Sequence, residues 1–168
     1  DLRGGPVLLT MPPHEPDRYM SAMIDDLYSN IVGYISPRTS GSAGGTFLVR
    51  GPAGGEPPSV VDGVFECPTD LAVVLIRTQL FDDDDLPNVH ALQDGVSVRS
   101  LGAAAEPLWP SVPTVEVRDT LDVGFLRALA WMLRLMPGLP EDHAIRQELT
   151  GLGIGVGSLE AILAEPSI

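Results

Sequence analysis

At 168 residues the chain has the length of one domain, which is enough to bury a substantial core. Hydrophobic residues make up 44% of it and aromatic residues only 5%, so the core is expected to be aliphatic. A formal net charge of −13 disfavours contact with phosphate backbones and anionic lipids, so no nucleic acid is expected as a partner.

The residue inventory excludes several chemistries. All ten basic residues are arginines, and the lack of lysine excludes a Schiff base, a pyridoxal phosphate attachment site and a P-loop lysine. Cys67 is the single cysteine, which excludes an internal disulfide and a multi-cysteine zinc site; we interpret it as a small apolar filler rather than a thiol nucleophile. The sequence contains no run of 18 apolar residues, so no membrane span is predicted. We therefore predict no cofactor.

Short apolar runs, each stopped by turn residues, fill the first hundred positions. The runs at 6–11, 18–25, 31–35 and 46–50 predict strands, and Asp62-Gly63 predicts a tight turn between short strands at 60–61 and 64–66. The run at 71–80 is interpreted as a strand, with a helix as the alternative. This rhythm favours an antiparallel sandwich over a helical bundle or a parallel sheet.

The acidic run from Asp82 to Asp85 predicts the start of a helix over 86–93. Asp85 is placed to cap free amides, its charge suits the positive end of a helix, and Pro87 is tolerated in the first turn. A divalent-cation site is the alternative, but four consecutive carboxylates cannot all converge on one ion.

The pattern changes in the last third of the chain. Apolar residues recur at helical spacing from 122 to 136, a second helix is predicted from about 140 to 150, and a third from Ser158. Glycines at 151–157 follow a helix rather than a strand, so they do not form a dinucleotide-binding loop. We predict a β-sandwich domain over 1–102, a linker over 103–119 and a helical unit over 120–168 that packs on the sandwich.

Several short motifs occur in a particular order: Tyr28-x-Asn30, Arg38-Thr39-x-Gly41, Pro68-Thr69-Asp70, Arg77-Thr78, a helix like Val89 to Asp94, and Gly-Ile-x-x-Gly at Gly153. Together they resemble the family called domain of unknown function 1254 (DUF1254), and the chain resembles the N-terminal half of its usual two-domain architecture. The resemblance implies a mainly β fold, an immunoglobulin-like antiparallel β-sandwich followed by a small C-terminal helical unit. It also implies a cell-envelope or secreted setting, with the cytoplasm as the alternative.

Candidate site residues follow from the strand ends and the motifs. Asp26, Tyr28 and Arg38 are the catalytic candidates if the protein is an enzyme, because an arginine can hold an oxygen while an aspartate or tyrosine moves a proton. A structural role at a loop is the alternative for all three. The motif residues supply the ligand-binding candidates: Asn30, Thr39, Thr69, Arg77 and His90. The three histidines are scattered without metal spacing, so no metal site is predicted.

Two classes of function remain. In the first, the sandwich binds a small apolar molecule or a protein partner, and homo-oligomer formation is left open. In the second, it is a small cofactor-free enzyme (a cyclase, isomerase or hydrolase) that acts on an apolar metabolite by Asp, Tyr and Arg acid-base catalysis. An enclosed apolar pocket that holds Tyr28 or Arg38 favours catalysis, whereas a filled core with only surface grooves favours binding.

Overall fold

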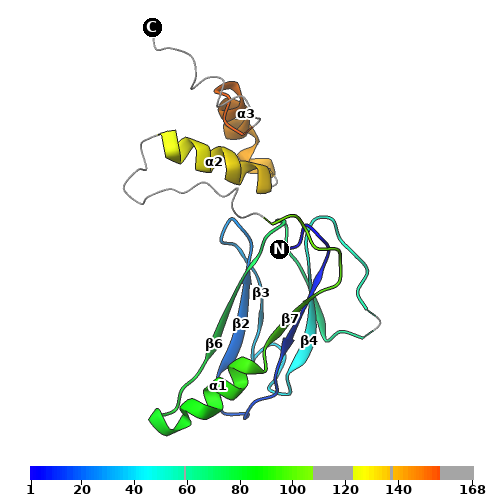
Figure 1. Ribbon diagram of the computed structural model, residues 1–168, viewed down its shortest axis with the longest axis vertical. Helices are drawn as coiled ribbons and strands as arrows, with labels where there is room; N and C mark the ends of the chain where they lie inside the picture. Colours follow the sequence, from blue (N-terminus) through cyan, green and yellow to red (C-terminus); the bar gives the residue numbers. More distant parts are fainter. Residues whose placement is uncertain (59, 108–122, 137, 156–168) are drawn as a thin grey trace. The chain divides into compact units, whose positions relative to one another are not determined.

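The computed structural model describes residues 1–58, 60–107, 123–136 and 138–155 (Figure 1). The chain divides into two compact units, Asp1–Ala105 and Glu106–Ile168. The first is rich in β-structure and the described part of the second is helical, as the spacing of apolar residues in the two parts predicts.

Two sheets make up the β-rich unit within the described residues. The four-stranded sheet has the order β5-β4-β1-β7, and the three-stranded sheet has the order β3-β2-β6. Their strands are β1 (Val7–Met11), β2 (Met20–Asp25), β3 (Ile31–Ile35), β4 (Gly45–Arg50), β5 (Gly63–Glu66), β6 (Val73–Thr78) and β7 (Ser97–Ser100).

The two sheets face each other across one aliphatic core. Leu9 of β1 and Val49 of β4 pack in the same cluster as Ala22 and Ile24 of β2. Each of these side chains is at most 1% exposed. Because strand side chains alternate between the two faces, every second residue of each inner strand enters this core. Apolar burial between the sheets is therefore the main stabilising term of the unit.

One strand pair differs from the expected antiparallel pattern. β5 runs parallel to β4, with Arg50 opposite Glu66. The predicted turn at Asp62-Gly63 does not form a hairpin, because the backbone and the carboxylate of Asp62 bond instead to Thr46 at the start of β4. These bonds fix the point at which β5 joins the edge of the sheet.

Gly33 of β3 provides a close contact between the sheets. A Cβ atom at this position would lie 2.4 Å from the ring of Phe65 on β5. The ring therefore occupies the space that any other residue would fill, and it also packs against Phe47, with 6.1 Å between ring centroids.

A helix and a short strand complete the β-rich unit. The acidic run forms a 3-10 turn, η1 (Asp83–Asp85), which leads into α1 (Leu86–Asp94), as predicted. Asp82, not Asp85, accepts the capping bond, from the backbone N–H of Asp85. Val89 is 5% exposed on the inner side of α1. Strand β7 follows, was not predicted, and pairs with β1.

The helical unit contains α2 (Val123–Leu135), the 3-10 turn η2 (Pro140–Asp142) and α3 (His143–Gly151). Arg146 of α3 donates to the backbone oxygens of Leu133 and Met136. A cation there satisfies carbonyls at the end of α2 that have no partner within the helix. The predicted third helix from Ser158 and most of the predicted linker lie outside the described residues.

Candidate functional site

The turn between β2 and β3 holds three of the predicted site residues. The carboxylate of Asp26 accepts hydrogen bonds from the backbone N–H groups of Tyr28 (2.8 Å) and Asn30 (2.9 Å) and from the Asn30 side chain (3.2 Å). Asp26 is 3% exposed. Ser29 adopts a φ of 63° at the tip of this turn. Asp26 thus supplies the acceptors that hold the turn in shape.

Thr69 lies at the same end of the unit and is fully buried. Its hydroxyl donates to the backbone oxygen of Leu71 (2.6 Å) and accepts from the backbone N–H of Leu27 (3.1 Å). The segment before β6 is therefore tied to the β2–β3 turn, and Asp26, Tyr28, Asn30 and Thr69 are neighbours.

The other candidates lie elsewhere. Arg38 and Thr39 follow β3, whereas Tyr28 precedes it, so the five residues of β3, roughly 17 Å of strand, separate the two groups. Thr39 accepts a bond from the backbone N–H of Ser36 and donates to the oxygen of Tyr34. Arg77 is exposed on β6, and His90 is exposed on α1. The structure does not bring Arg38 together with Asp26 and Tyr28.

A buried charge cluster occupies the opposite end of the unit from Asp26. The guanidinium of Arg18, 1% exposed, makes paired bonds with Asp85 (2.7 and 2.8 Å) and with Glu15 (2.9 Å each). It also donates to the backbone oxygen of Gln79 (2.7 Å) and lies over the ring of Phe81, 4.4 Å from its centroid. All five N–H donors of the arginine are therefore engaged.

The cluster shifts the acidity of its members. Hydrogen bonds from Arg18 lower the pKa of Glu15 to about 2. Hydrogen bonds from the same guanidinium hold the pKa of Asp85 well below its usual range, and those two carboxylates raise the pKa of Arg18. The cluster stays ionised at any ordinary pH and has no donor left for a ligand. It joins the β1–β2 loop to the start of α1.

Sequence reasoning did not find this cluster. Arg18 and Asp85 are 67 positions apart, and neither belongs to a local motif. The available signal was an arginine directly before the apolar run of β2, together with an acidic run longer than one helix cap requires.

Strand β6 is an edge of the three-stranded sheet, and β7 is an edge of the four-stranded sheet. An apolar crevice opens between the two sheets on the side where these edges lie. Its volume is about 250 Å³, and Leu9 and Val49 form its floor. Val98 of β7 is opposite Leu9 in the sheet register and therefore faces inward, yet it is 65% exposed. The remaining wall residues are Asp1, Leu2, Val7, Ala72 and Val74. Thr69, through its bond to Leu71, helps to place the segment that carries Ala72.

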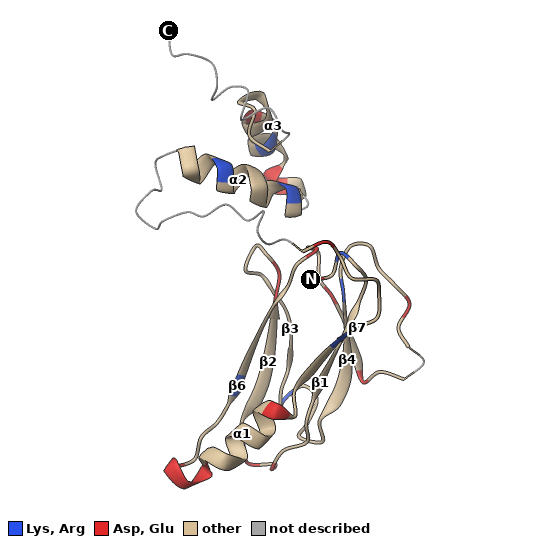
Figure 2. Cartoon of the chain, viewed as in Figure 1, with Lys and Arg blue, Asp and Glu red and all other residues tan. Residues whose placement is uncertain are grey.

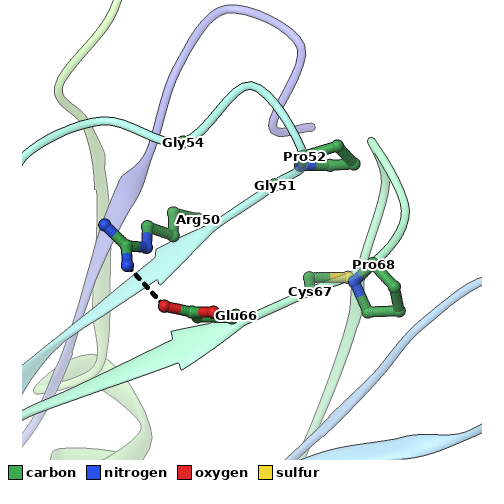
Figure 3. Close-up of a pocket in the computed structure, with 7 residues that line it drawn as sticks. All are labelled: Arg50, Gly51, Pro52, Gly54, Glu66, Cys67 and Pro68. Carbon is green, nitrogen blue, oxygen red and sulfur yellow. Dashed lines mark hydrogen bonds and ion pairs between the residues drawn. The ribbon is translucent and has the colours of Figure 1, made fainter.

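A second hollow, of about 510 Å³, lies at the ends of β4 and β5 (Figure 3). Arg50 and Glu66 form an ion pair across it, and Arg50 also donates to the backbone oxygen of Gly55 (3.1 Å). Cys67 is buried beside Thr69, with 3.4 Å between Sγ and Oγ1. The two charged side chains of this hollow are thus paired with each other, and the thiol of Cys67 lies next to a threonine hydroxyl rather than a base.

Within the described ranges, no group of three or more histidine, cysteine, aspartate or glutamate side chains is arranged to hold a metal ion. Figure 2 shows the acidic run at the start of α1, where Asp82 caps the turn and Asp85 binds Arg18. Among the described helices, none combines the length and apolarity that a membrane crossing requires.

These features define a β-rich domain of two facing sheets with a small helical unit. Residues 1–100 match the model of the family described as "Protein of unknown function (DUF1254)". The chain belongs to this family, which confirms the resemblance carried by its motifs.

The fold is similar to that of the VPA0106 protein from Vibrio parahaemolyticus, known from its crystal structure. The TM-score is 0.65 at 23% sequence identity, and the alignment covers 93% of this chain and 39% of that one. At this identity the likeness concerns the fold alone, and the chain spans well under half of the longer protein. The curated proteins contain no match.

Proposed function

We propose that the β-rich unit binds a small apolar molecule in the crevice between its sheets. The inward-facing but exposed Val98 carries the proposal, because an apolar side chain that faces a core is normally covered. Ligand sites are concave and mostly apolar. Asp1 is the one charged residue among those that line the crevice, so the favoured ligand is neutral. A volume of about 250 Å³ suits a small one.

The geometry gives less support to the enzymatic alternative. Acid-base catalysis by Asp26, Tyr28 and Arg38 requires the three side chains to meet at one substrate. Arg38 lies beyond the far end of β3 from the other two, and both oxygens of Asp26 accept bonds from the turn. We therefore propose structural roles for Asp26 and Thr69, and we keep Asn30, Thr39, Arg77 and His90 as candidates for contacts outside the crevice.

We also propose that the two sheets form an immunoglobulin-like sandwich. In that fold, strands B and E pair in one sheet and strands C and F pair in the other. The antiparallel pairs β1–β4 and β2–β6 fit these two positions. The parallel strand β5 and the pairing of β7 with β1 are departures from it.

Binding of the fluorescent apolar probe N-phenyl-1-naphthylamine to the 168-residue chain tests the proposed site. Val98→Asp places a charge at the mouth of the crevice, and we expect it to weaken binding at least tenfold with little change in the thermal midpoint, since Val98 is already exposed. Val64→Asp on the outer face of β5, where the side chain is 42% exposed, is the matched control. Failure of the probe to bind, or equal affinities for the two variants, would reject the crevice as the site.

A further inference from the structure

The outer face of the three-stranded sheet carries exposed apolar side chains. Along β2, Met20, Ala22 and Ile24 enter the core. Ser21, Met23 and Asp25 therefore point to the opposite, outer face. Their register partners share that face: Met23 is opposite both Tyr34 of β3 and Leu75 of β6.

An apolar stripe crosses this face from edge to edge. Tyr34, Met23 and Leu75 form one row across the three strands, and Tyr34 and Leu75 are 38% and 41% exposed. The next row adds Ile31 (55% exposed) and Val73 (54% exposed) on either side of Asp25. Side chains of this size at such exposure, gathered on one face, are typical of an interaction surface.

Opposite charges lie on either side of the Met23 row. Arg77 lies opposite Ser21, and Asp25 lies opposite Val73, so about 13 Å of strand separates the two rows. Neither side chain forms an ion pair with another described residue, and one carboxylate oxygen of Asp25 is buried without a hydrogen-bond donor among them. A buried carboxylate oxygen without a donor is costly, and an added cation would offset that cost.

We propose that a second copy of this chain docks on this face with two-fold symmetry. The two-fold axis runs between the two copies, parallel to their faces, perpendicular to the strands and along the Met23 row. Rotation about it places β6 of one copy on β6 of the other, with the strand direction reversed. Arg77 of each copy then lies over the row of Asp25 and Val73 in the other. A two-fold interface must be self-complementary, and a cation and an anion on either side of an apolar stripe meet that requirement.

The size of the face sets the expected affinity. Three strands and six residues give a surface of roughly 15 by 20 Å. Two such faces bury roughly 600 Å² together, which is below the roughly 1,200 Å² of standard specific interfaces, so we expect a weak, transient dimer with a dissociation constant of tens of micromolar.

Sedimentation velocity of the 168-residue chain between about 1 and 200 µM tests the proposal. The native chain shifts from monomer to dimer over this range. Leu75→Glu and Arg77→Glu each weaken the dimer at least tenfold, the first by placing charge in the stripe and the second by setting a carboxylate against Asp25 of the other copy. The controls, Val64→Glu (42% exposed) and Arg99→Glu, lie on the outer face of the other sheet and leave the dimer unchanged.

Mixing two defective variants separates loss of the interface from loss of fold. Arg77→Glu alone opposes two carboxylates at each contact, and Asp25→Arg alone opposes two cations. Mixed one to one, they form a heterodimer in which both contacts join opposite charges, so dimer mass returns. A chain that stays monomeric at 200 µM, a dimer unaffected by Leu75→Glu, or a mixture that remains monomeric would overturn the proposal.

Discussion

The two ends of the gap between β6 and β7 are built differently. At one end, α1 lies across the gap, and the Arg18 cluster fixes its start to the β1–β2 loop (Figure 1). At the other end, Val98 is left exposed above an apolar crevice. Arg18 at the closed end uses all its hydrogen-bond donors within the protein, whereas the open end leaves apolar surface uncovered. The charges with the most strongly perturbed pKa values thus bind one another inside the fold, while the crevice at the open end is lined mainly by apolar side chains.

The largest effect is expected at the closed end. Arg18→Met leaves Asp85, 8% exposed at its side chain, without its cation, and an uncompensated buried carboxylate is strongly destabilising. We expect the thermal midpoint to fall by on the order of 15 °C. Arg99→Met removes an exposed arginine on β7 and serves as the control, with a change near zero. Equal shifts for the two variants would mean that the cluster does not hold this end closed.

The loop before β4 tests how tightly the closed end is packed. Gly44 has a φ of 74°, and a Cβ atom there would lie 2.6 Å from the backbone oxygen of Met11. We expect Gly44→Ala to cost about 2 kcal/mol or more, from backbone strain and this clash. Gly41 has a similar φ of 76° with no atom within 4 Å, so Gly41→Ala isolates the strain at about 1 kcal/mol. Chemical denaturation measures both.

Asp26 tests the open end. Asp26→Ala removes the acceptor for two backbone N–H groups, and we expect a loss of about 1–2 kcal/mol in the free energy of unfolding. Asp26→Asn retains one acceptor oxygen and costs less. Binding of the apolar probe should be largely preserved in Asp26→Asn. If Asp26→Asn keeps full stability but no longer converts a substrate that the native chain converts, a catalytic role for Asp26 is favoured instead.

The smallest effect is a dependence on pH. The pKa of Glu15 is lowered from 4.5 to about 2 in the folded state, so its contribution to stability is complete above the unfolded value and is lost as pH falls toward 2. Glu15 is about half exposed, so solvent screens the pair and the effect is a few degrees. The difference in thermal midpoint between the native chain and Glu15→Gln should be constant above about pH 5.5 and should shrink between pH 4.5 and 2. A difference that grows in acid contradicts this assignment.

Local patterns predicted most of the elements. Strand β3 has the predicted bounds, 31–35, and β1, β4, β6 and α1 agree to within a few residues. These segments bury one apolar face, which leaves a periodic signal in the sequence. Strand β7 has no such signal, because all four of its residues are exposed and it exists through pairing with β1, about 90 positions earlier.

The parts that sequence did not predict depend on distant partners. The parallel pairing of β5 follows from Asp62 bonding to Thr46, and a dipeptide suited to a turn gives no indication of that choice. The motif residues near Tyr28 and Thr69 do come together, whereas Arg38 does not join them, because β3 extends between them. Tyr28 and Arg38 are close in sequence, but the predicted strand between them already places them at its opposite ends.

The wide spacing of the Arg18 cluster has a kinetic consequence. Its carboxylates come from positions 15 and 85, so the contact with Asp85 closes a loop of 67 positions, and we expect it to form late in folding. Contacts made late in folding slow unfolding more than they speed folding. The cluster should therefore set how long a folded molecule lasts before it opens, while the aliphatic strands determine how quickly it forms.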